Sequence, residues 1–351
     1  MPSTNVQPGL VLVTQVMDQD HEILGFFVSW IRMLARFNHT VTVLCWKHGT
    51  CKDMPANVQI LELPKGASRR WFMLMRHTFV HRREFQTFFV HMITPVTASV
   101  GWWLRLLNKR VVQWYTHGHV PLSLRITEVL SHRLLTATPE SLRIASKKVH
   151  VVGHGIDTDY YKPTPDVDRV AKILVVGRVT PKKCLEECIE VARKIREHAP
   201  DLAFTMSFVG SPYTAQDQQY QEKIRGLVKS LNLEASIEWA GKHIGASLMK
   251  HYSTSAVLLS TSATGSLDKV VLEAMACETP VIATGEAYRH LKTIHAFPSA
   301  TSREAIELMI DCLRHPRNIH SAREEVIRGS GLAQLTRTIH DECFPDCVET
   351  R

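Results

Sequence analysis

The sequence contains no long hydrophobic run. No apolar segment reaches the roughly 18 residues that a membrane-spanning helix requires. The first residues, MPSTNVQPG, do not place a basic segment before an apolar one, as a signal peptide would. We therefore expect a protein of the cytoplasm.

The eight cysteines form no C-x-x-C pair. Two pairs have three residues between them, Cys184 with Cys188 and Cys343 with Cys347, and this is not the spacing of a zinc ribbon. We expect reduced, mostly buried thiols and no metal site.

A dinucleotide-binding glycine motif is also missing. Residues 9–16 are predicted to form a strand, residues 26–36 a helix and residues 40–46 a second strand. The turn before the helix would need G-x-G-x-x-G to hold a dinucleotide, and it contains only Gly25. An enzyme that uses a nicotinamide cofactor is therefore not expected.

Acidic residues are scarce in the first half of the chain. Residues 1–150 hold 18 Lys and Arg against 8 Asp and Glu, a net charge of +10. The remaining residues hold 24 and 26, a net charge of −2, which together give the +8 of the whole chain. The surface for an acidic partner is therefore predicted in the first half.

The segment KGASRRWFMLMRHTFVHRRE, residues 65–84, has no acidic residue before its last position. One interpretation is a helix that packs its apolar face on the core and leaves its arginines in water. The other is an amphipathic helix that lies on an anionic membrane. No motif of a nucleic-acid reader is present, so nucleic acid is not expected as a partner. The basic residues of this segment are Lys65, Arg69, Arg70, Arg76, Arg82 and Arg83.

The chain is long enough for two globular domains. Of its 351 residues, 44% are hydrophobic and 22% are charged, which is the composition of an ordinary folded protein. A single core rarely grows beyond about 250–300 residues. We therefore expect two α/β domains with parallel sheets.

Residues 256–283 are predicted to form a complete βαβ unit. The apolar runs 256–259 and 280–283 read as buried parallel strands, and a helix that opens near Leu267 supplies the right-handed crossover.

The loop before this helix has the composition of a phosphate site. Gly265 and Ser266 allow close approach of the backbone to a ligand, and the N–H groups of the first helical turn favour an anion. Glu273, about two turns further along, is either a solvated helix residue or a carboxylate that accepts hydroxyl groups of a ribose or sugar.

This strand, Ser-rich loop, LEAMA helix and C-x-T-P-V turn resemble the donor site of GT-B glycosyltransferases, specifically the retaining enzymes of glycosyltransferase family 4. In that family a second Glu, separated from a first by seven residues, holds the nucleotide ribose. Glu273 occupies the second position, but Gly265 occupies the first. Asp268 and Lys269 are the candidates for the missing contact. Glu278 replaces a usual glycine and would be strained in a left-handed conformation.

A second motif follows the first strand of the second domain, predicted at residues 172–176. The segment GRVTPKKC resembles the G-R-x-x-x-x-K of the family, so Arg178 and Lys183 are predicted to neutralise the departing diphosphate. By the same resemblance, Gly210 and Lys242, at the ends of two later strands, are predicted to line the nucleotide site.

Residues 88–91 of the first domain are predicted to form a strand that ends in a loop with Thr94, Pro95 and Thr97.

The first domain contributes fewer candidates. His117 follows a strand at residues 111–115, where a family histidine often faces the donor sugar, and His119 follows it closely. Gly25 and Asp20 lie in the first turn, as candidates for contacts with donor phosphate or with acceptor hydroxyls. The Asp18-Gln-Asp20 triplet has the form of a D-x-D metal clamp, but that motif belongs to another fold.

The resemblance implies the domain plan and the activity. We expect an acceptor-side Rossmann-like domain at residues 1–155, a donor-binding domain at 156–320 and a C-terminal helix and tail at 321–351 that returns to the first domain. The hinge reads GHGID, where the family has PNGID. The activity implied is sugar transfer from a nucleotide-diphosphate sugar to a lipid-linked, glycan or other hydroxyl acceptor, with retention and without a metal or cofactor.

Two other classes stay open. One is a GT-B relative of different chemistry, a sugar-nucleotide epimerase or hydrolase. The other is a catalytically inactive nucleotide-binding module, for which Gly265 in the first Glu position is the argument. Under the transferase interpretation, the basic segment containing Arg69 and Arg83 would hold the protein at the inner membrane face.

Overall fold

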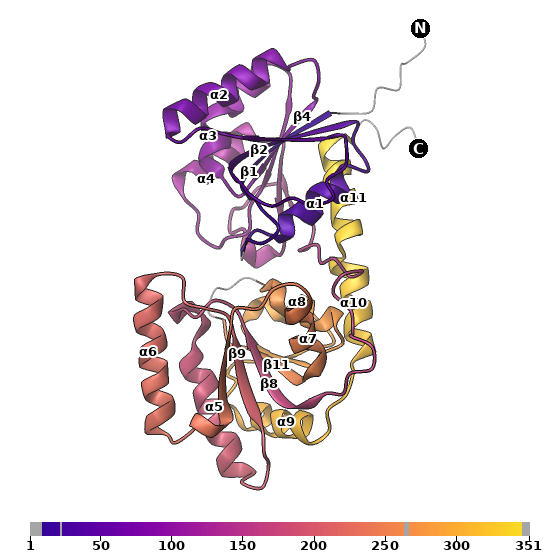
Figure 1. The fold of residues 1–351 in the computed structure, drawn as a ribbon. Helices are drawn as coiled ribbons and strands as arrows, with labels where there is room; N and C mark the ends of the chain where they lie inside the picture. Colours follow the sequence, from indigo (N-terminus) through magenta and orange to yellow (C-terminus); the bar gives the residue numbers. More distant parts are fainter. Residues whose placement is uncertain (1–8, 22, 263–266, 346–351) are drawn as a thin grey trace. The chain divides into compact units, whose positions relative to one another are not determined.

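The computed structural model describes residues 9–21, 23–262 and 267–345. The chain divides into two compact units, Met1–Gly155 with Leu332–Arg351 and Ile156–Gly331. Both are α/β units with a parallel sheet (Figure 1). Across the described residues, none of the helices has the length and apolar character needed to cross a membrane.

The first unit is built on a seven-stranded parallel sheet with the strand order β3-β2-β1-β4-β5-β6-β7. Its strands are β1 (Gly9–Met17), β2 (Thr40–His48), β3 (Val58–Glu62), β4 (Thr87–His91), β5 (Arg110–Trp114), β6 (Arg133–Thr136) and β7 (Val149–Val151). Its α-helices are α1 (Phe26–Leu34), α2 (Ala67–Val80), α3 (Thr94–Leu106), α4 (Leu122–Leu130) and α11 (Leu332–Cys343).

Both faces of this sheet are covered by helices, and its strands alternate between them. Leu10 and Leu12 of β1 pack in one core with α1 and α11, while Val11 and Val13 pack in another with α2 and α3. Figure 1 shows α2, α3 and α4 on one side of the sheet and α1 and α11 on the other. Burial on two faces explains why β1 and β4 are almost continuously apolar in sequence.

The helix α3 corrects the sequence prediction. Thr94, Pro95 and Thr97 were expected in a loop after β4, but the helix begins at Thr94 and has a proline in its first turn. Proline is favoured there because its missing N–H would have no partner inside the helix. The threonines are buried: Thr97 donates to Gln113 of β5 at 2.6 Å, and Thr127 of α4 donates to the carbonyl oxygen of Thr94 at 3.0 Å.

The second unit is a six-stranded parallel sheet with the order β10-β9-β8-β11-β12-β13. Its strands are β8 (Val170–Val176), β9 (Thr205–Val209), β10 (Ile237–Gly241), β11 (Ser255–Ser260), β12 (Val281–Thr284) and β13 (His295–Phe297). Its α-helices are α5 (Leu185–His198), α6 (Ala215–Ser230), α7 (Ala246–Thr254), α8 (Lys269–Ala276), α9 (Arg303–Arg314) and α10 (His320–Ser330). Two 3₁₀ turns, η2 (Pro181–Lys183) and η4 (Glu286–Tyr288), follow β8 and β12.

The C-terminal segment is shared between the units. The helix α10 packs against α8 of the second unit, whereas α11 packs against α1 of the first. A single β-bridge joins Ile156 to Gly331, where the chain enters and leaves the second unit. The tail was expected to begin at residue 321, and the structure places its passage to the first unit at Leu332.

The predicted βαβ unit forms as β11, α8 and β12. The helix begins at Lys269, two residues later than expected, because Leu267 and Asp268 remain extended or irregular. Glu278, in the turn after the helix, has φ of 60°, which is the left-handed conformation in which strain was expected. Its carboxylate lies 2.7 Å from His320 of α10, and its carbonyl oxygen accepts from the N–H of Ile319. These contacts hold the strained residue in place.

Three glycines form the carboxyl edge of β8, β9 and β10. Gly177, Gly210 and Gly241 all have positive φ, and the N–H of Gly210 donates to the carbonyl oxygen of Gly241 at 2.8 Å. A Cβ on Gly210 would lie 1.9 Å from the carbonyl oxygen of Gly177. No other residue type therefore fits at Gly210 without moving this edge.

We expect Gly210→Ala to lower the free energy of unfolding by more than about 1 kcal/mol, because alanine is strained at positive φ and meets backbone. The measurement is urea denaturation beside Gly226→Ala. Gly226 lies exposed within α6, where a Cβ would contact nothing within 4 Å. That control should gain about 0.5–1 kcal/mol. An unchanged midpoint for Gly210→Ala would contradict the close approach.

Candidate functional site

The strand order of the second unit fixes where a site can form. The chain runs outward from β8 through β9 to β10, and then returns to build β11 on the other side of β8. The connections after β8 and β11 therefore leave the sheet in opposite directions, and a crevice opens between them at the carboxyl edge. The predicted residues Arg178 and Lys183 follow β8, and Asp268 and Lys269 follow β11.

An ion pair joins these two connections. The Lys183 ammonium lies 2.7 Å from a carboxylate oxygen of Asp268, and both side chains are mostly buried. Beneath the pair, Thr261 donates from its hydroxyl to the carbonyl oxygen of Lys183 at 2.8 Å. Two segments that lie 85 residues apart in sequence are thus held together at the switch point.

The surroundings of the pair fix both partners. A Cβ on Gly177 would lie 2.9 Å from Cε of Lys183, so the glycine leaves room for the lysine stem. On the other side, the hydroxyl of Tyr288 hydrogen-bonds with Asp268 and lies 3.3 Å from the hydroxyl of Ser260. Burial, with the Asp268 charge beside it, raises the pKa of Tyr288, so its phenol stays protonated and can donate.

Arg178 is the second cation of this edge. It directly follows Gly177 and is partly exposed, and none of the described residues forms a hydrogen bond or ion pair with its guanidinium. The backbone beside it is fixed, because the N–H of Val179 donates to the carbonyl oxygen of Ser211 at 3.2 Å. An arginine whose backbone is fixed and whose guanidinium has no partner among the described residues can turn its fork toward an oxyanion.

Glu273 lies inside the unit and not on a solvated face. It is buried, and Tyr252 donates to its carboxylate from a phenol at 2.8 Å. Tyr161 also hydrogen-bonds with this carboxylate. Burial raises the pKa of Glu273, and the hydrogen bond from Tyr252 opposes that rise. The alternative of a solvated helix residue is therefore wrong for Glu273.

Lys269 begins α8 with its ammonium buried, although the residue is partly exposed. Burial lowers the pKa of this lysine well below its ordinary value, and the nearby Glu273 carboxylate opposes the shift. The N-terminus of α8 thus has the ion pair of Lys183 with Asp268 at its opening and the Lys269 amine beneath it.

The remaining candidates of the second unit differ in what the structure shows. Gly210 belongs to the glycine edge, and Lys242 is exposed directly after β10. Leu267 is buried in the core beside α8. Gly265 and Ser266 lie outside the described residues.

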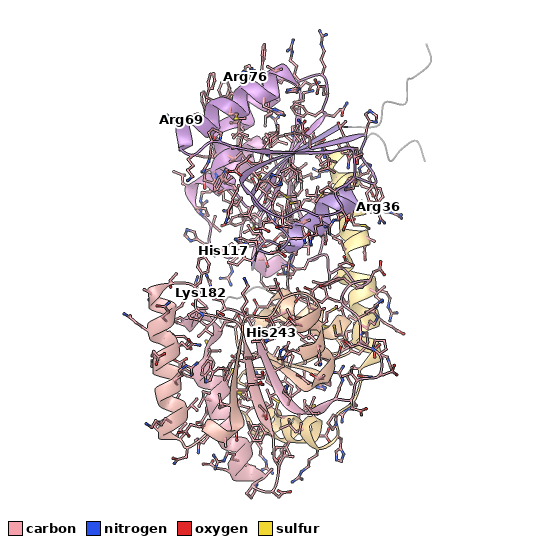
Figure 2. All side chains as sticks on the ribbon, in the orientation of Figure 1. Arg36, Arg69, Arg76, His117, Lys182 and His243 are labelled. Atoms are coloured by element: carbon pink, nitrogen blue, oxygen red, sulfur yellow. The ribbon has the colours of Figure 1, made fainter. Side chains whose placement is uncertain are left out.

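The candidates of the first unit gather at the carboxyl edge of its own sheet. His117 and His119 follow β5 and are exposed, and the N–H of His119 donates to Nδ1 of His117 at 3.1 Å. Asp20 is exposed in the loop after β1, where its N–H donates to the Asp18 carboxylate at 3.1 Å. A Cβ on Gly25 would lie 2.6 Å from the carbonyl oxygen of Gln19, so Gly25 allows this loop to fold tightly. Figure 2 labels His117 among the side chains of the first unit.

The sequence interpretation missed the residues that support the site. Tyr252 and Tyr161 hold Glu273, Tyr288 holds Asp268, and Thr261 holds the backbone of Lys183. None of them belongs to a motif. Tyr288 and Tyr252 lie in strongly apolar surroundings, where a phenol needs a hydrogen-bond partner, and that requirement was the one available signal.

One cysteine adjoins the site, since the Cys188 thiol lies 3.2 Å from the hydroxyl of Thr261. The seven cysteines among the described residues form no disulfide with one another, and five of them are buried. The part of the chain that the structure describes contains no group of three or more His, Cys, Asp or Glu side chains able to hold a metal ion.

The arrangement suits a ligand that carries several negative charges. Two cations and the N-terminus of α8 lie at one switch point, beside an edge lined by glycines. Helix N-termini and convergent cations both stabilise phosphate oxygens. Hydroxyl-bearing groups would find carboxylates at Asp268 and Glu273.

Comparisons with known protein sequences find matches in the region that contains this site. Residues 159–297 match the family model "Glycosyl transferases group 1". A curated relative, the D-inositol 3-phosphate glycosyltransferase of Kineococcus radiotolerans, is 30% identical over 148 residues, which are 39% of this chain and 34% of that protein. The chain thus matches about a third of the length of this relative.

Solved structures extend the likeness to the whole chain. HepE of Anabaena, in complex with UDP, has a TM-score of 0.75 at 14% identity and covers 98% of this chain and 100% of its own. A glycosyltransferase of Rickettsia africae has a TM-score of 0.77 at 16% identity, with 97% and 98% covered. Sucrose-phosphate synthase of Thermosynechococcus elongatus has a TM-score of 0.74 at 16% identity, with 98% and 100% covered. The chain therefore has the GT-B fold of glycosyltransferases, and most of its second unit matches the glycosyl transferases group 1.

Proposed function

We propose that this protein is a glycosyltransferase that moves a sugar from a nucleotide-diphosphate sugar to a hydroxyl acceptor with retention of configuration. The observation that carries the proposal is the ion pair of Lys183 and Asp268 at the switch point, beside Arg178 and the N-terminus of α8. The match of residues 159–297 to glycosyl transferases group 1 supports it. So does the fold shared with HepE, whose structure holds UDP.

In this mechanism the bond between the anomeric carbon and the diphosphate oxygen breaks, and a bond from the acceptor oxygen forms on the same face. The acceptor proton passes to the departing diphosphate. Arg178 and Lys183 stabilise the negative charge that grows on the leaving group, in the role that a metal has in other transferases. We therefore propose transfer without a bound metal or a cofactor.

When the diphosphate departs, the Lys183 ammonium must either leave the Asp268 carboxylate or contact the carboxylate and the diphosphate together. A carboxylate 2.7 Å from the ammonium holds the lysine at the switch point before the ligand arrives, so the cation needs little reorganisation. We assign the sugar contact of the missing first Glu to Asp268, with Lys269 beneath it. Glu273 is assigned to the nucleotide ribose.

We assign the acceptor to the first unit, with His117, Gly25 and Asp20 as its contacts. The acceptor proposed is a lipid-linked sugar or a growing polysaccharide. A location in the cytoplasm at the inner face of the membrane follows from that acceptor, with the basic residues Arg69, Arg70, Arg82 and Arg83 facing anionic lipid. No role for nucleic acid is proposed.

A thermal-shift panel of nucleoside diphosphates and their sugar conjugates tests the donor site. We expect stabilisation by one nucleotide series, since a ligand at about 100 times its dissociation constant adds about 2.7 kcal/mol. Glu273→Gln should weaken the binding roughly tenfold, because the ribose loses a charged acceptor while Tyr252 keeps an oxygen to donate to.

Glu286→Gln is the matched control, because it removes an exposed carboxylate of η4 in the same unit. It should leave the nucleotide shift unchanged. If no nucleotide shifts the transition of the wild-type protein, the donor site is refuted. If nucleotide binds but no donor and acceptor pair turns over, an inactive binding module is favoured, and consumption of donor without an acceptor favours a hydrolase or epimerase.

Arg178→Ala and Lys183→Ala should each lower kcat about a hundredfold while raising the dissociation constant of the nucleotide far less. The reason is that the leaving-group charge is greatest in the transition state. The measurements are steady-state kinetics and nucleotide titration. Lys182→Ala, the exposed neighbour in η2, is the control and should keep both values. Equal losses in turnover and binding would count against this role.

A further inference from the structure

Helix α4 exposes an apolar stripe. Leu122, Ile126 and Val129 recur every four and three residues, which places them on one side of the helix. Leu122 is 73% exposed and Val129 66%, whereas Leu124 and Thr127 on the opposite side are buried in the unit. A helix that already buries one face has no need of a second apolar face for its own folding.

The neighbouring helices continue this surface. On α3, Trp102 and Leu106 are exposed, and on α2, Phe72 is 64% exposed beside Phe79 and Val80. The ring of Phe79 lies 5.9 Å from that of Trp103, which lies 6.1 Å from Trp102. These rings connect α2 to α3.

Close packing connects α3 to α4. A Cβ on Gly101 would lie 3.0 Å from Leu130, and Arg105 donates to the carbonyl oxygen of Leu130. The three helices, which cover one side of the first sheet (Figure 1), therefore form a continuous layer. We call its outward side the three-helix surface.

The three-helix surface is strongly basic. Residues 67–130 contain nine Lys and Arg and only two acidic residues, a net charge of +7 against +8 for the whole chain. Both acids have partners, since Glu84 binds His81 at 3.0 Å and Glu128 accepts from Ser146 at 2.7 Å. Figure 2 shows Arg69 and Arg76 on α2, directed away from the sheet. The exposed arginines are Arg69, Arg76, Arg83, Arg105 and Arg125.

We propose that the three-helix surface docks the protein on an anionic lipid bilayer. Large apolar side chains interleaved with arginines fit the boundary between acyl chains and headgroups, where indole rings are favoured and arginine stems lie along apolar surface with their charge in the headgroup layer. The proposal extends the lipid contact proposed above for the basic residues of α2 to α3 and α4, and it does not depend on sugar transfer.

Charge disfavours a second copy of this chain as the occupant. A two-fold dimer through this surface would bring the same patch from each subunit together, and each patch carries the exposed arginines named above. Like charges at an interface suppress such pairing. An anionic lipid surface supplies the opposite charge over the same area.

The helix α2 alone does not account for this surface. Leu122, Ile126 and Val129 belong to α4, which is no part of the basic segment recognised in the sequence. Trp102 lies in α3, which is no part of that segment either. The proposal therefore requires α3 and α4 as well as α2 to contact lipid, and this requirement separates it from a single amphipathic helix.

Co-sedimentation of the full chain with vesicles tests the proposal. The vesicles are phosphatidylcholine alone and phosphatidylcholine with phosphatidylglycerol, at low and high salt and without nucleotide. We expect binding to the vesicles that contain phosphatidylglycerol, weakened by salt. Leu122→Gln with Val129→Gln should weaken it about tenfold, and Arg105→Gln with Arg125→Gln roughly tenfold to thirtyfold at low salt.

Matched controls lie on the second unit. Val170→Gln with Ile327→Gln removes two exposed apolar side chains there, and Lys250→Gln with Arg289→Gln removes two exposed charges. All four variants change exposed residues, and thermal unfolding checks that each keeps its fold. The control pairs should bind vesicles as the wild type does.

Three results would overturn the proposal. The first is no co-sedimentation of the wild-type protein with vesicles that contain phosphatidylglycerol. The second is loss of binding in Phe72→Gln with Phe79→Gln while the α4 variant binds like its control, which would leave α2 as the sole contact. The third is a dimer in light scattering that the α4 variant abolishes. Since no nucleotide is present, failure here leaves the transferase proposal standing, and failure of the nucleotide panel leaves this one standing.

Discussion

The strand order of the second unit is the constraint on which the site depends. Because β8 lies between β9 and β11, the connections that follow β8 and β11 part from each other and leave their backbone groups facing a ligand. Lys183 and Asp268 come from those two connections, and their ion pair crosses the switch point. Nothing in the local sequence around either residue predicts their contact. The crossover handedness and the order of the strands bring them together.

The residues that support this ion pair are glycines, a tyrosine and a threonine, and none of them is assigned a catalytic role. Positive φ at Gly177 and Gly210 lets two strand ends approach within a distance that a Cβ would prevent. Tyr288 and Thr261 bind the carboxylate and the lysine backbone. A cation held in this way is pre-organised for an oxyanion, which is the property that a leaving diphosphate requires of its site.

The first unit is also built on a parallel sheet, and its unusual feature is the outer side of one of its helix layers. Its sheet is buried on both faces, by α1 and α11 on one side and by α2, α3 and α4 on the other. A helix layer in this architecture needs only its inner side to be apolar. The fold therefore does not explain the exposed apolar side of α4, which lies among arginines. Exposed apolar patches rimmed by polar residues mark interaction surfaces.

The parallel α/β class and the βαβ unit of residues 256–283 could be predicted from the sequence, because they depend on local apolar runs. For Glu278 the sequence predicted strain only on the condition that its turn is left-handed. It also identified Arg178, Lys183 and Glu273 as residues of interest, through the spacing of short motifs. It missed α4 and took the start of α3 for a loop, since Pro95 reads as a break unless the helix is known to begin beside it. The folded structure was needed to show that Glu273 is buried against Tyr252, that Asp268 contacts Lys183, and that three helices share one basic and apolar side. The physical reason is that each of these facts joins residues from separate elements, and a spacing along the chain carries no distance between elements until the strand order is known.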